Sequence, residues 1–480
     1  MSTHLVSRRS FIQYLGATAA ACSLGSPARA DSRPNVVVIV ADDMGWRDPG
    51  CYGSTFYETP VLDGLARDGC RFTSAYSAAA VCSPTRASLL TGNYPARVGI
   101  TQYIGGSQKP TPYKTNLGDE LTLGDVFRQN GYATGYVGKW HLCASDNENV
   151  HGPKQHGFTY AIGNNGSMPR YFPPHRNFWR QQEPPTIHLP PTAGEEYLTD
   201  RLTDKALGFI EQNASQPFLL YLAFYNPHTP IEAREKLVEK YEEKARAMGI
   251  DKPGQSMFAP EPIGDTVTRQ IQNNPVYAAM IEILDANVGR MLQKLETEGI
   301  AKNTIVVFLS DNGGLSCYGA RPTSNAPLRA GKGWLYEGGI RIPFMVRAPS
   351  VTHGRVQNTP VITTDLFPTL MELAGVAPPE DQHRDGLSLV PLLRGDSSWK
   401  RDDLFWHCPH TYPNPVPCSA IRKANYKLIE YLQNGRCELY DLKEDIGETR
   451  DLAELMPGQC EAMRTALRQW RDRVGANMPQ

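Results

Sequence analysis

The sequence lacks an excess of charge of either sign, because 49 lysines and arginines face 50 aspartates and glutamates among 480 residues. Proteins that attract nucleic acid or anionic membrane surfaces carry a basic excess, so the composition argues against both as partners. After the first thirty residues the sequence also lacks any apolar run long enough to span a bilayer, so stable membrane insertion is not expected. Internal repeats and low-complexity tracts are absent too. What is present, a hydrophobic content of 40%, supports a large core that we expect to be divided into two domains.

The N-terminus carries an export signal. Ser7–Gln13 (SRRSFIQ) is a twin-arginine motif, the weakly apolar stretch Tyr14–Leu24 follows it, and Ala28–Ala30 forms an A-x-A cleavage site. Residues 1–30 are therefore expected to be a signal peptide that the twin-arginine translocase recognises, and the mature protein to be periplasmic or secreted. A lipid anchor on Cys22 is a less favoured alternative, because Ala-Ala-Ala-Cys is a poor lipoprotein box.

Cysteine is scarce, with 10 residues in the whole chain. Cys22 lies in the predicted signal peptide, and Cys82 is a candidate reactive residue that is considered separately below. Eight cysteines remain, an even number that suits disulfide bonding in an oxidising compartment. Their connectivity cannot be read from the sequence, but Cys408 and Cys418 flank a proline-rich loop and are candidates for pairing.

Short β-branched runs alternate with amphipathic helical stretches along most of the chain. The runs that predict strands are Asn35–Val40, Ala133–Val137, Pro217–Phe224, Thr304–Leu309 and Pro343–Val346. The stretches that predict helices are Pro60–Asp68, Leu123–Gln129, Tyr197–Gln212, Val276–Glu298 and Leu366–Ala374. This alternation predicts an α/β fold with a mostly parallel central sheet.

The chain changes character after Gly375, where it becomes rich in proline, and a domain boundary is expected between residues 375 and 400. We assign residues 31–385 to a large catalytic domain and residues 386–480 to a small α+β domain. In the small domain the sequence predicts strands at Tyr426–Tyr431 and Glu438–Asp441 and a final helix near Gln459–Val474.

Chemically reactive side chains follow four of the predicted strands. The four segments are Asp42–Asp43, Gly138–His141, Asn226–His228 and Asp311–Asn312. Each segment alone is compatible with a helix cap or a solvated turn. Because ligands bind beyond the carboxyl ends of strands in open α/β sheets, four such segments at one edge are better explained as a site.

The acidic members of this set offer only oxygen ligands. Asp42, Asp43, Asp311 and Asn312 suit a hard cation, Ca²⁺ first and Mg²⁺ second, rather than zinc, which prefers histidine or thiolate. Adjacent carboxylates also need a cation to coexist in a partly buried site. The sequence therefore predicts a calcium site at this edge of the sheet.

A cysteine precedes a predicted helix in Val81–Gly92, VCSPTRASLLTG. Pro84 fits the first turn of a helix, and Gly92 fits its end, so Cys82 is expected at the N-terminus, where backbone N–H groups favour negative charge. For a lone cysteine a small buried residue is the simpler interpretation. The nearby cations and histidines favour a nucleophile or an oxyanion instead. They are Arg86, Lys139, Lys332, His141 and His228.

Together these residues resemble the type I, formylglycine-dependent sulfatases of the alkaline phosphatase superfamily. The resemblance is carried first by Cys82–Gly92, which looks like the signature of that family. It extends to further motifs over nearly the whole mature chain: Asp42–Gly45, Gly138–His141, Pro227–Pro230, Ser310–Gly314, Gly331–Gly339, Asp365–Gly375, Asp385–Leu389 and Glu438–Leu442.

The resemblance implies an arylsulfatase-like enzyme with an α/β/α sandwich and a smaller C-terminal domain. It implies that a maturation enzyme converts Cys82 to formylglycine, whose hydrated form attacks sulfur. By the same resemblance Asp42, Asp43, Asp311 and Asn312 hold Ca²⁺, together with the hydrated residue 82.

Roles for the remaining residues also come from the resemblance. Arg86 and Lys139 would stabilise the charge of the diol on residue 82. His228 with Lys332 would neutralise the leaving alcohol. His141 would remove the second hydroxyl proton of the diol, so that sulfate leaves and the aldehyde returns.

The substrate is less well defined than the reaction. The loops Gly163–Pro185 and Phe405–Ser419 are rich in aromatic residues, proline, arginine and histidine, which suits contact with sugar rings and anionic groups as well as an ordinary surface loop. We expect a sulfated carbohydrate as the natural substrate, with activity on aryl sulfates. Two alternatives remain: a phosphate or phosphonate ester hydrolase acting at the same site, and a non-catalytic protein that binds sulfated glycans.

Overall fold

The computed structural model describes residues 33–105, 112–144, 151–164, 170–172, 196–252, 257–261, 266–349, 351, 353–377, 379, 384–411 and 416–479. The predicted signal peptide, Cys22 and most of the loop 163–185 lie outside the described residues. From Arg33 onward the chain forms one unit. Within its described part, no helix combines the length and the apolar character that crossing a membrane requires.

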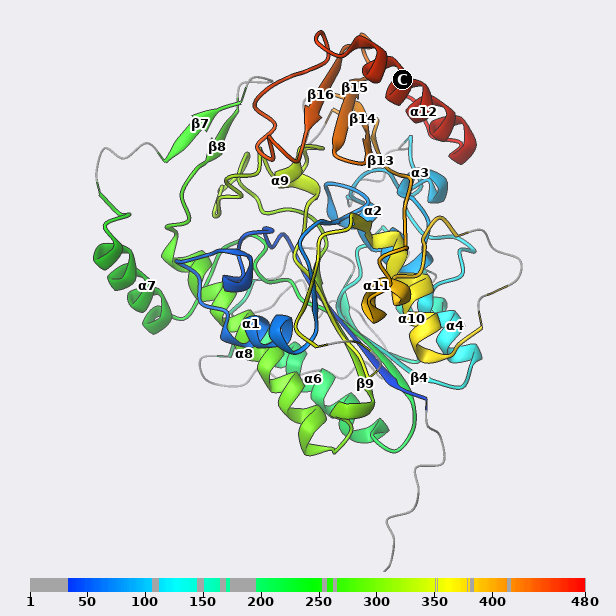
Figure 1. Cartoon of the computed structure of the whole chain (residues 1–480). Coiled ribbons are helices and arrows are strands. Elements are labelled where there is room, and N and C mark those ends of the chain that lie inside the picture. Colours follow the sequence, from blue (N-terminus) through cyan, green and yellow to red (C-terminus); the bar gives the residue numbers. More distant parts are fainter. Residues whose placement is uncertain are drawn as a thin grey trace, which may run out of the picture. The chain divides into compact units, whose positions relative to one another are not determined.

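A sheet of eight strands forms the centre of this unit (Figure 1). Its order is β11-β2-β10-β9-β1-β6-β4-β5, and the five strands from β9 to β5 are parallel to one another, whereas β10 is antiparallel to both of its neighbours. The predicted mostly parallel sheet is confirmed. The strands are β1 (Asn35–Ala41), β2 (Cys70–Phe72), β4 (Ala133–Lys139), β5 (Tyr160–Asn164), β6 (Phe218–Ala223), β9 (Thr304–Ser310), β10 (Phe344–Arg347) and β11 (Arg355–Gln357).

Helices cover both faces of the sheet, which is why all seven residues of β1 are buried. Val36, Val38 and Val40 pack on one face into a cluster with α2, α4 and α10, and Val37 and Ile39 pack on the other with α1, α6 and α8. The helices that form these two layers are α1 (Pro60–Asp68), α2 (Cys82–Thr91), α4 (Leu123–Gln129), α6 (Leu198–Asn213), α8 (Pro275–Thr297) and α10 (Leu366–Ala374). The result is a three-layer α/β/α sandwich.

Local sequence explains where several of these helices begin. Thr122 accepts a hydrogen bond from the backbone of Asp125, whose side chain bonds back to the N–H of Thr122, so α4 begins with a capping box. Asn274 caps α8 directly before Pro275, and Pro60 occupies the first turn of α1.

The chain beyond residue 400 forms a second, antiparallel sheet of four strands in the order β13-β14-β15-β16. Its strands are β13 (Asp403–Cys408), β14 (Cys418–Lys423), β15 (Tyr426–Tyr431) and β16 (Cys437–Asp441). The C-terminal helix α12 (Pro457–Val474) contributes Met463, Leu467 and Trp470 to the core of this sheet. The predicted small α+β arrangement is therefore present, while the boundary at residue 385 stays a prediction.

A buried ion-pair cluster connects the second sheet to the large sandwich. Lys427 of β15 lies with its Nζ 3.1 Å from Glu337 Oε1 and 2.8 Å from Glu448 Oε1, and none of these three side chains is exposed. Glu337 begins α9 (Glu337–Ile340), five residues after Lys332. The second sheet thus supports the segment that carries a predicted site residue.

The remaining elements lie at the edges of this framework. They are β3 (Ala75–Tyr76), β7 (Phe258–Pro260), β8 (Val267–Arg269), β12 (Val361–Ile362), α3 (Pro95–Val98), α7 (Glu235–Met248) and α11 (Val390–Arg394), with 3₁₀ turns at Gly50–Tyr52, Pro153–His156, Ala301–Asn303 and Thr363–Asp365.

The nine cysteines in the described residues are all in the thiol form. Cys408 and Cys418, the pair suggested by the sequence, face each other as register partners on β13 and β14. Their pairing as a disulfide is not present in this structure.

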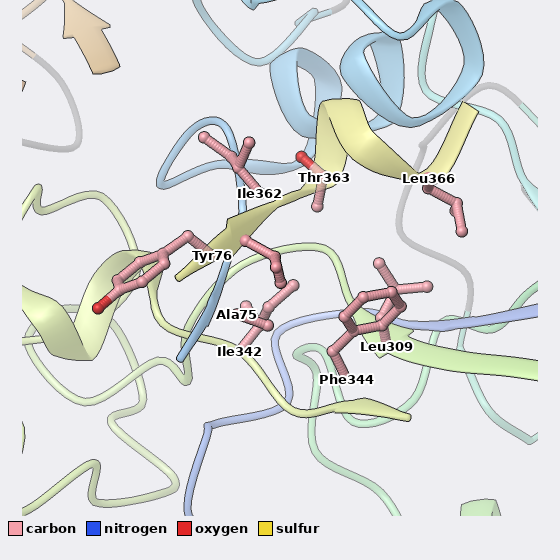
Figure 2. A pocket seen from close by; sticks show the side chains of 9 residues that line it. Ala75, Tyr76, Leu309, Ile342, Phe344, Ile362, Thr363 and Leu366 are labelled. Carbon is pink, nitrogen blue, oxygen red and sulfur yellow. The ribbon is translucent and has the colours of Figure 1, made fainter. Parts of the chain in front are cut away.

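A small pocket lies between the β3–β12 ribbon and the strands β9 and β10 (Figure 2). Its lining is apolar apart from Thr363 and Tyr76, and the hydroxyl of Tyr76 donates a hydrogen bond to Glu337. In Figure 2 that hydroxyl points away from the other lining side chains. Because no charged side chain lines this pocket, the chemistry predicted from the sequence lies elsewhere.

Candidate active site

Four neighbouring parallel strands deliver seven of the predicted residues to one edge of the central sheet, and α2 and the segment before α9 supply Cys82, Arg86 and Lys332. The segments after β9, β1, β6 and β4 lie side by side because these strands are adjacent and point the same way. Direct contacts or electrostatic interactions join all ten predicted site residues into one cluster: Asp42, Asp43, Cys82, Arg86, Lys139, His141, His228, Asp311, Asn312 and Lys332.

The oxygen ligands lie together at the centre of the cluster. The backbone N–H of Asp43 donates to Asp311 Oδ1 at 3.1 Å, and Asn312 Nδ2 donates to Asp43 Oδ1 at 2.8 Å. Within the described structure, Asn312 Oδ1 is buried without a hydrogen-bond partner. Three buried carboxylates and one unpaired amide oxygen fit a hard divalent cation.

The carboxylates affect one another's ionisation. Burial raises the pKa of Asp311 to about 6, and the nearby charge of Asp42 adds to this shift. Burial acts in the same direction on Asp42, but Lys139, His228 and Arg86 outweigh it and hold its pKa well below the usual range. Anionic oxygens this close together are stabilised only by the surrounding cations.

Cys82 is the first residue of α2, as the position of Pro84 predicted. Every residue of α2 is buried, and Cys82 Sγ lies 3.7 Å from Asp42 Oδ1. Burial raises the pKa of the Cys82 thiol to about 12, although Lys139 and Lys332 oppose the shift. The unmodified side chain is therefore a protonated thiol at neutral pH, which is a poor nucleophile.

Arg86 and Lys139 form ion pairs with the carboxylates. Arg86 donates to Asp311 Oδ2 through Nη2 at 2.7 Å and to the backbone carbonyl of Lys139 through Nη1 at 2.8 Å. Lys139 Nζ donates to Asp42 Oδ2 at 2.6 Å. The backbone approaches β6 closely here: Gly138 has a φ of 107°, and a Cβ atom on it would lie 1.8 Å from the carbonyl oxygen of Ala223. Only glycine fits immediately before Lys139.

The hydrogen bonds of His141 determine which nitrogen carries its proton. Nε2 lies 3.0 Å from the carbonyl oxygen of Ile104, and since a carbonyl only accepts, Nε2 must carry the hydrogen. Among the described residues, Nδ1 is buried and has no hydrogen-bond partner. Burial, followed by the charges of Lys139 and Arg86, holds the pKa of His141 well below its usual range. The ring is neutral, with Nδ1 available as a proton acceptor.

His228 and Lys332 form a second proton-carrying pair. His228 Nδ1 donates to the carbonyl oxygen of Thr229 at 2.7 Å, so Nε2 is the acceptor, and it receives a hydrogen bond from Lys332 Nζ at 3.1 Å. Lys332 Nζ also lies 2.7 Å from Asp43 Oδ1. Burial lowers the pKa of His228 to about 4. The neutral ring therefore receives its hydrogen bond from a lysine.

Two site residues have strained backbone conformations. Asp43 has a φ of 66° and His141 a φ of 58°, values in the left-handed region that favours glycine. Such conformations are retained where the surrounding contacts fix them, and they concentrate at functional sites.

Ser83 and Ile104 belong to the site although no sequence motif predicted a role for them. Ser83 Oγ accepts a hydrogen bond from the backbone N–H of Ile104 at 3.0 Å, and the carbonyl of the same Ile104 holds His141. Ser83 lies inside the Cys82–Gly92 motif, directly after Cys82, so its position in the sequence could have identified it as a site residue. Ile104 has no polar side chain, and its role depends on a tertiary contact that no motif reveals.

The formal charges in the site balance before any ligand binds. Asp42, Asp43 and Asp311 oppose Arg86, Lys139 and Lys332. Adding a divalent cation leaves a net charge of about +2, which attracts an anionic ester and stabilises charge that develops during its cleavage.

The chain is similar to known proteins over most of its length. The family model described as Sulfatase matches residues 34–376, and the model described as N-sulphoglucosamine sulphohydrolase, C-terminal, matches residues 330–471. A protein named Sulfatase from Formosa agariphila is 32% identical, over 92% of this chain and 89% of its own. N-acetylgalactosamine-6-sulfatase from Canis lupus familiaris is 35% identical, over 80% of this chain and 70% of its own.

A solved structure is also similar over most of its length. The crystal structure of Ps i-CgsB in complex with k-i-k-neocarrahexaose superposes with a TM-score of 0.74 at 28% identity, covering 91% of this chain and 92% of that one.

Proposed function

The chain belongs to the sulfatase family and is a sulfuric ester hydrolase with the alkaline phosphatase fold, and on that basis we propose that it removes sulfate from a sulfated carbohydrate by means of formylglycine made from Cys82. The observation that carries the proposal is the set of three carboxylates and three cations gathered around Cys82. The relative named N-acetylgalactosamine-6-sulfatase and the neighbour in complex with k-i-k-neocarrahexaose support a carbohydrate substrate.

Formylglycine and calcium are the two groups that the proposal adds to the chain. Formylglycine at residue 82 would supply a hydrated aldehyde as the nucleophile, and Ca²⁺, which Asp42, Asp43, Asp311 and Asn312 would hold, would supply positive charge to the site. The position of Cys82 at the start of a fully buried helix, 3.7 Å from Asp42 Oδ1, supports residue 82 as the place where such a group would act. The all-oxygen donor set and the unpaired Asn312 Oδ1 support Ca²⁺, with Mg²⁺ less favoured.

The metal proposal has a direct test. Asp311→Ala removes a predicted metal ligand, so it should lose the bound cation and reduce metal affinity by more than about 100-fold. Removing a residue that only hydrogen-bonds to a ligand already reduces metal affinity by up to about 100-fold. Metal analysis of the purified protein and calcium titration, with turnover of an aryl sulfate measured in parallel, provide the readout. Asp402→Ala is the matched control, because Asp402 is exposed on the surface. Stoichiometric zinc in active wild-type protein would show that the ligand assignment is wrong.

The remaining residues of the chain bind the anion and move protons. Arg86 and Lys139 would stabilise negative charge on residue 82, since both lie against the carboxylates beside it. His228 with Lys332 would neutralise the leaving alcohol, and the proton would come from Lys332, whose Nζ donates to Nε2 of the neutral His228 ring. His141 would accept a proton at Nδ1 and so promote release of sulfate from residue 82.

Ser83 is expected to position His141 through Ile104. Ser83→Ala removes the acceptor of the buried Ile104 N–H, so the carbonyl that orients His141 loses its anchor. We expect kcat to fall by about 10-fold or more with KM nearly unchanged, because misplaced catalytic groups slow chemistry more than binding. Retention of sulfate on residue 82, seen by intact-protein mass, should increase, and Ser83→Thr should restore part of the activity.

The matched control for Ser83 lies in the same helix. Ser88 is also buried and also hydrogen-bonded, to Thr363 Oγ1 at 2.7 Å, but it has no contact with His141. Ser88→Ala should lower thermal stability without retention of sulfate. Equal kinetic effects of the two alanine variants would remove Ser83 from this role.

Maturation and export complete the proposal. A formylglycine-generating enzyme would act on Cys82, the twin-arginine translocase would recognise residues 1–30, and residues 31–385 and 386–480 would form a catalytic and a small C-terminal domain of a periplasmic or secreted protein. The experiment that tests the function compares sulfate, phosphate and phosphonate esters of one alcohol on matured protein. A kcat/KM higher for phosphate or phosphonate than for sulfate would overturn it.

A further inference from the structure

Cysteines that follow residue 400 lie in two facing pairs. We propose that Cys408 with Cys418, and Cys437 with Cys460, are sites of disulfide formation that link the elements of the second sheet. The proposal rests on the proposed function in one respect only: export would bring the chain into a compartment that supplies the oxidant.

The first pair is defined by strand register. Cys408 ends β13, Cys418 begins β14, and the two are direct partners across the antiparallel ladder. Residues directly opposite in such a ladder have Cα atoms about 4.5–5.5 Å apart, which falls within the roughly 4.4–6.8 Å that a disulfide spans. The register of this pair is therefore compatible with a disulfide.

The second pair joins a strand to a helix. Cys437 is the first residue of β16 and Cys460 lies in the first turn of α12, and both side chains pack against the same hydrophobic cluster, where their thiols interact with each other. The thiol of Cys437 donates a hydrogen bond to the carbonyl oxygen of Gly435 at 3.7 Å. Both side chains are partly exposed, so a small oxidant can reach them.

The cysteines of the large sandwich have different neighbours. Cys317 contacts the hydroxyls of Ser316 and Thr268, and Cys51 interacts with Asp63. These two thiols have polar partners in place of a second sulfur atom.

The chemistry is ordinary thiol–disulfide exchange. The thiolate of the more exposed cysteine, Cys408 in the first pair, attacks glutathione disulfide, a mixed disulfide forms, and glutathione leaves. The partner thiolate then attacks the sulfur of that mixed disulfide and releases the second glutathione. Each bond formed removes two protons and two electrons from the protein and reduces one glutathione disulfide to two glutathiones.

The experiment uses the matured full chain, incubated with glutathione disulfide, then denatured and alkylated without a reducing agent. After trypsin digestion, residues 437–443 and 451–464 should be recovered as one linked species, and residues 402–422 as one peptide lacking two hydrogens and carrying no alkyl group. Reduction before alkylation should abolish both products and lower the Tm by about 5 °C.

Variants separate the two pairs. Cys460→Ser should make Cys437 available to alkylation and leave the peptide 402–422 unchanged, whereas Cys51→Ser should change neither product. Alkylation of all four thiols after exposure to glutathione disulfide, or bonds to other cysteines, would overturn the proposal.

The proposed function can fail independently of the disulfides. None of the four cysteines touches the site around Cys82, so ester hydrolysis is measured on the same samples as a separate result. The bonds could form with glutathione disulfide in vitro but be absent in protein recovered from the periplasm. That result would contradict the idea that export supplies the oxidant, and it would still support the pairing of the cysteines.

Discussion

Alanine in place of Cys82 is expected to lower the turnover of every sulfate ester by at least about 10⁴-fold, the order of loss that follows removal of a catalytic nucleophile. The physical reason is that Cys82 is the residue at which carboxylates and cations converge, at the start of a buried helix. Folding should be largely unaffected, because the side chain is small. The measurement is kcat/KM on an aryl sulfate, with circular dichroism to check the fold.

The chemical state of residue 82 is tested on the wild-type protein. Trypsin releases Cys82 within residues 72–86, and hydrazide trapping followed by mass analysis should find an aldehyde there when a maturation system is present. Cys70→Ala is the control, since Cys70 is a buried cysteine of β2 outside the site. An unmodified thiol at residue 82 in fully active protein would contradict the mechanism.

Alanine variants of the two histidines are expected to lose activity in different ways. His228 accepts a hydrogen bond from Lys332, and the pair would neutralise the leaving oxygen with the proton of the lysine, a step that matters for a basic sugar alkoxide and little for a nitrophenolate. His228→Ala should therefore lose about 10²–10⁴-fold on a sugar sulfate and much less on nitrophenyl sulfate. The measurement is kcat/KM on both substrates.

His141→Ala should slow both substrates to a similar extent. The Nε2–H of His141 donates to the carbonyl of Ile104, and Nδ1 has no hydrogen-bond partner among the described residues, so Nδ1 can accept a proton. Loss of this base would block release of sulfate whichever alcohol has left. Intact-protein mass after mixing should show sulfate retained on residue 82 with each substrate. Equal losses for His228→Ala across the two substrates would remove His228 from the neutralisation of the leaving oxygen.

The sequence predicted those parts of the fold and the site in which reactive side chains lie directly next to recognisable strands and helices. Asp42 and Asp311 end buried β-branched runs, and since parallel strands finish at one edge, their proximity followed from the fold class alone. Helix α4 was predictable from its capping residues, and α2 from Pro84 and Gly92. These features depend on neighbours along the chain.

Other parts of the site depend on contacts between distant segments. The carbonyl of Ile104 orients His141, although nothing in the side chain of Ile104 signals this role. Lys427 lies between Glu337 and Glu448 from two other segments, so no spacing along the chain reveals that the three charges neutralise one another. Such pairings are fixed by packing, which the sequence expresses only through the whole fold.

The complete burial of α2 has a consequence for timing. If an enzyme converts Cys82 as proposed, it would need this segment unfolded, because the folded protein buries every residue of α2. The conversion would then be finished during or just after synthesis, in competition with folding. A chain that folds first would stay unconverted, so the active fraction of a preparation would depend on the relative rates of conversion and folding.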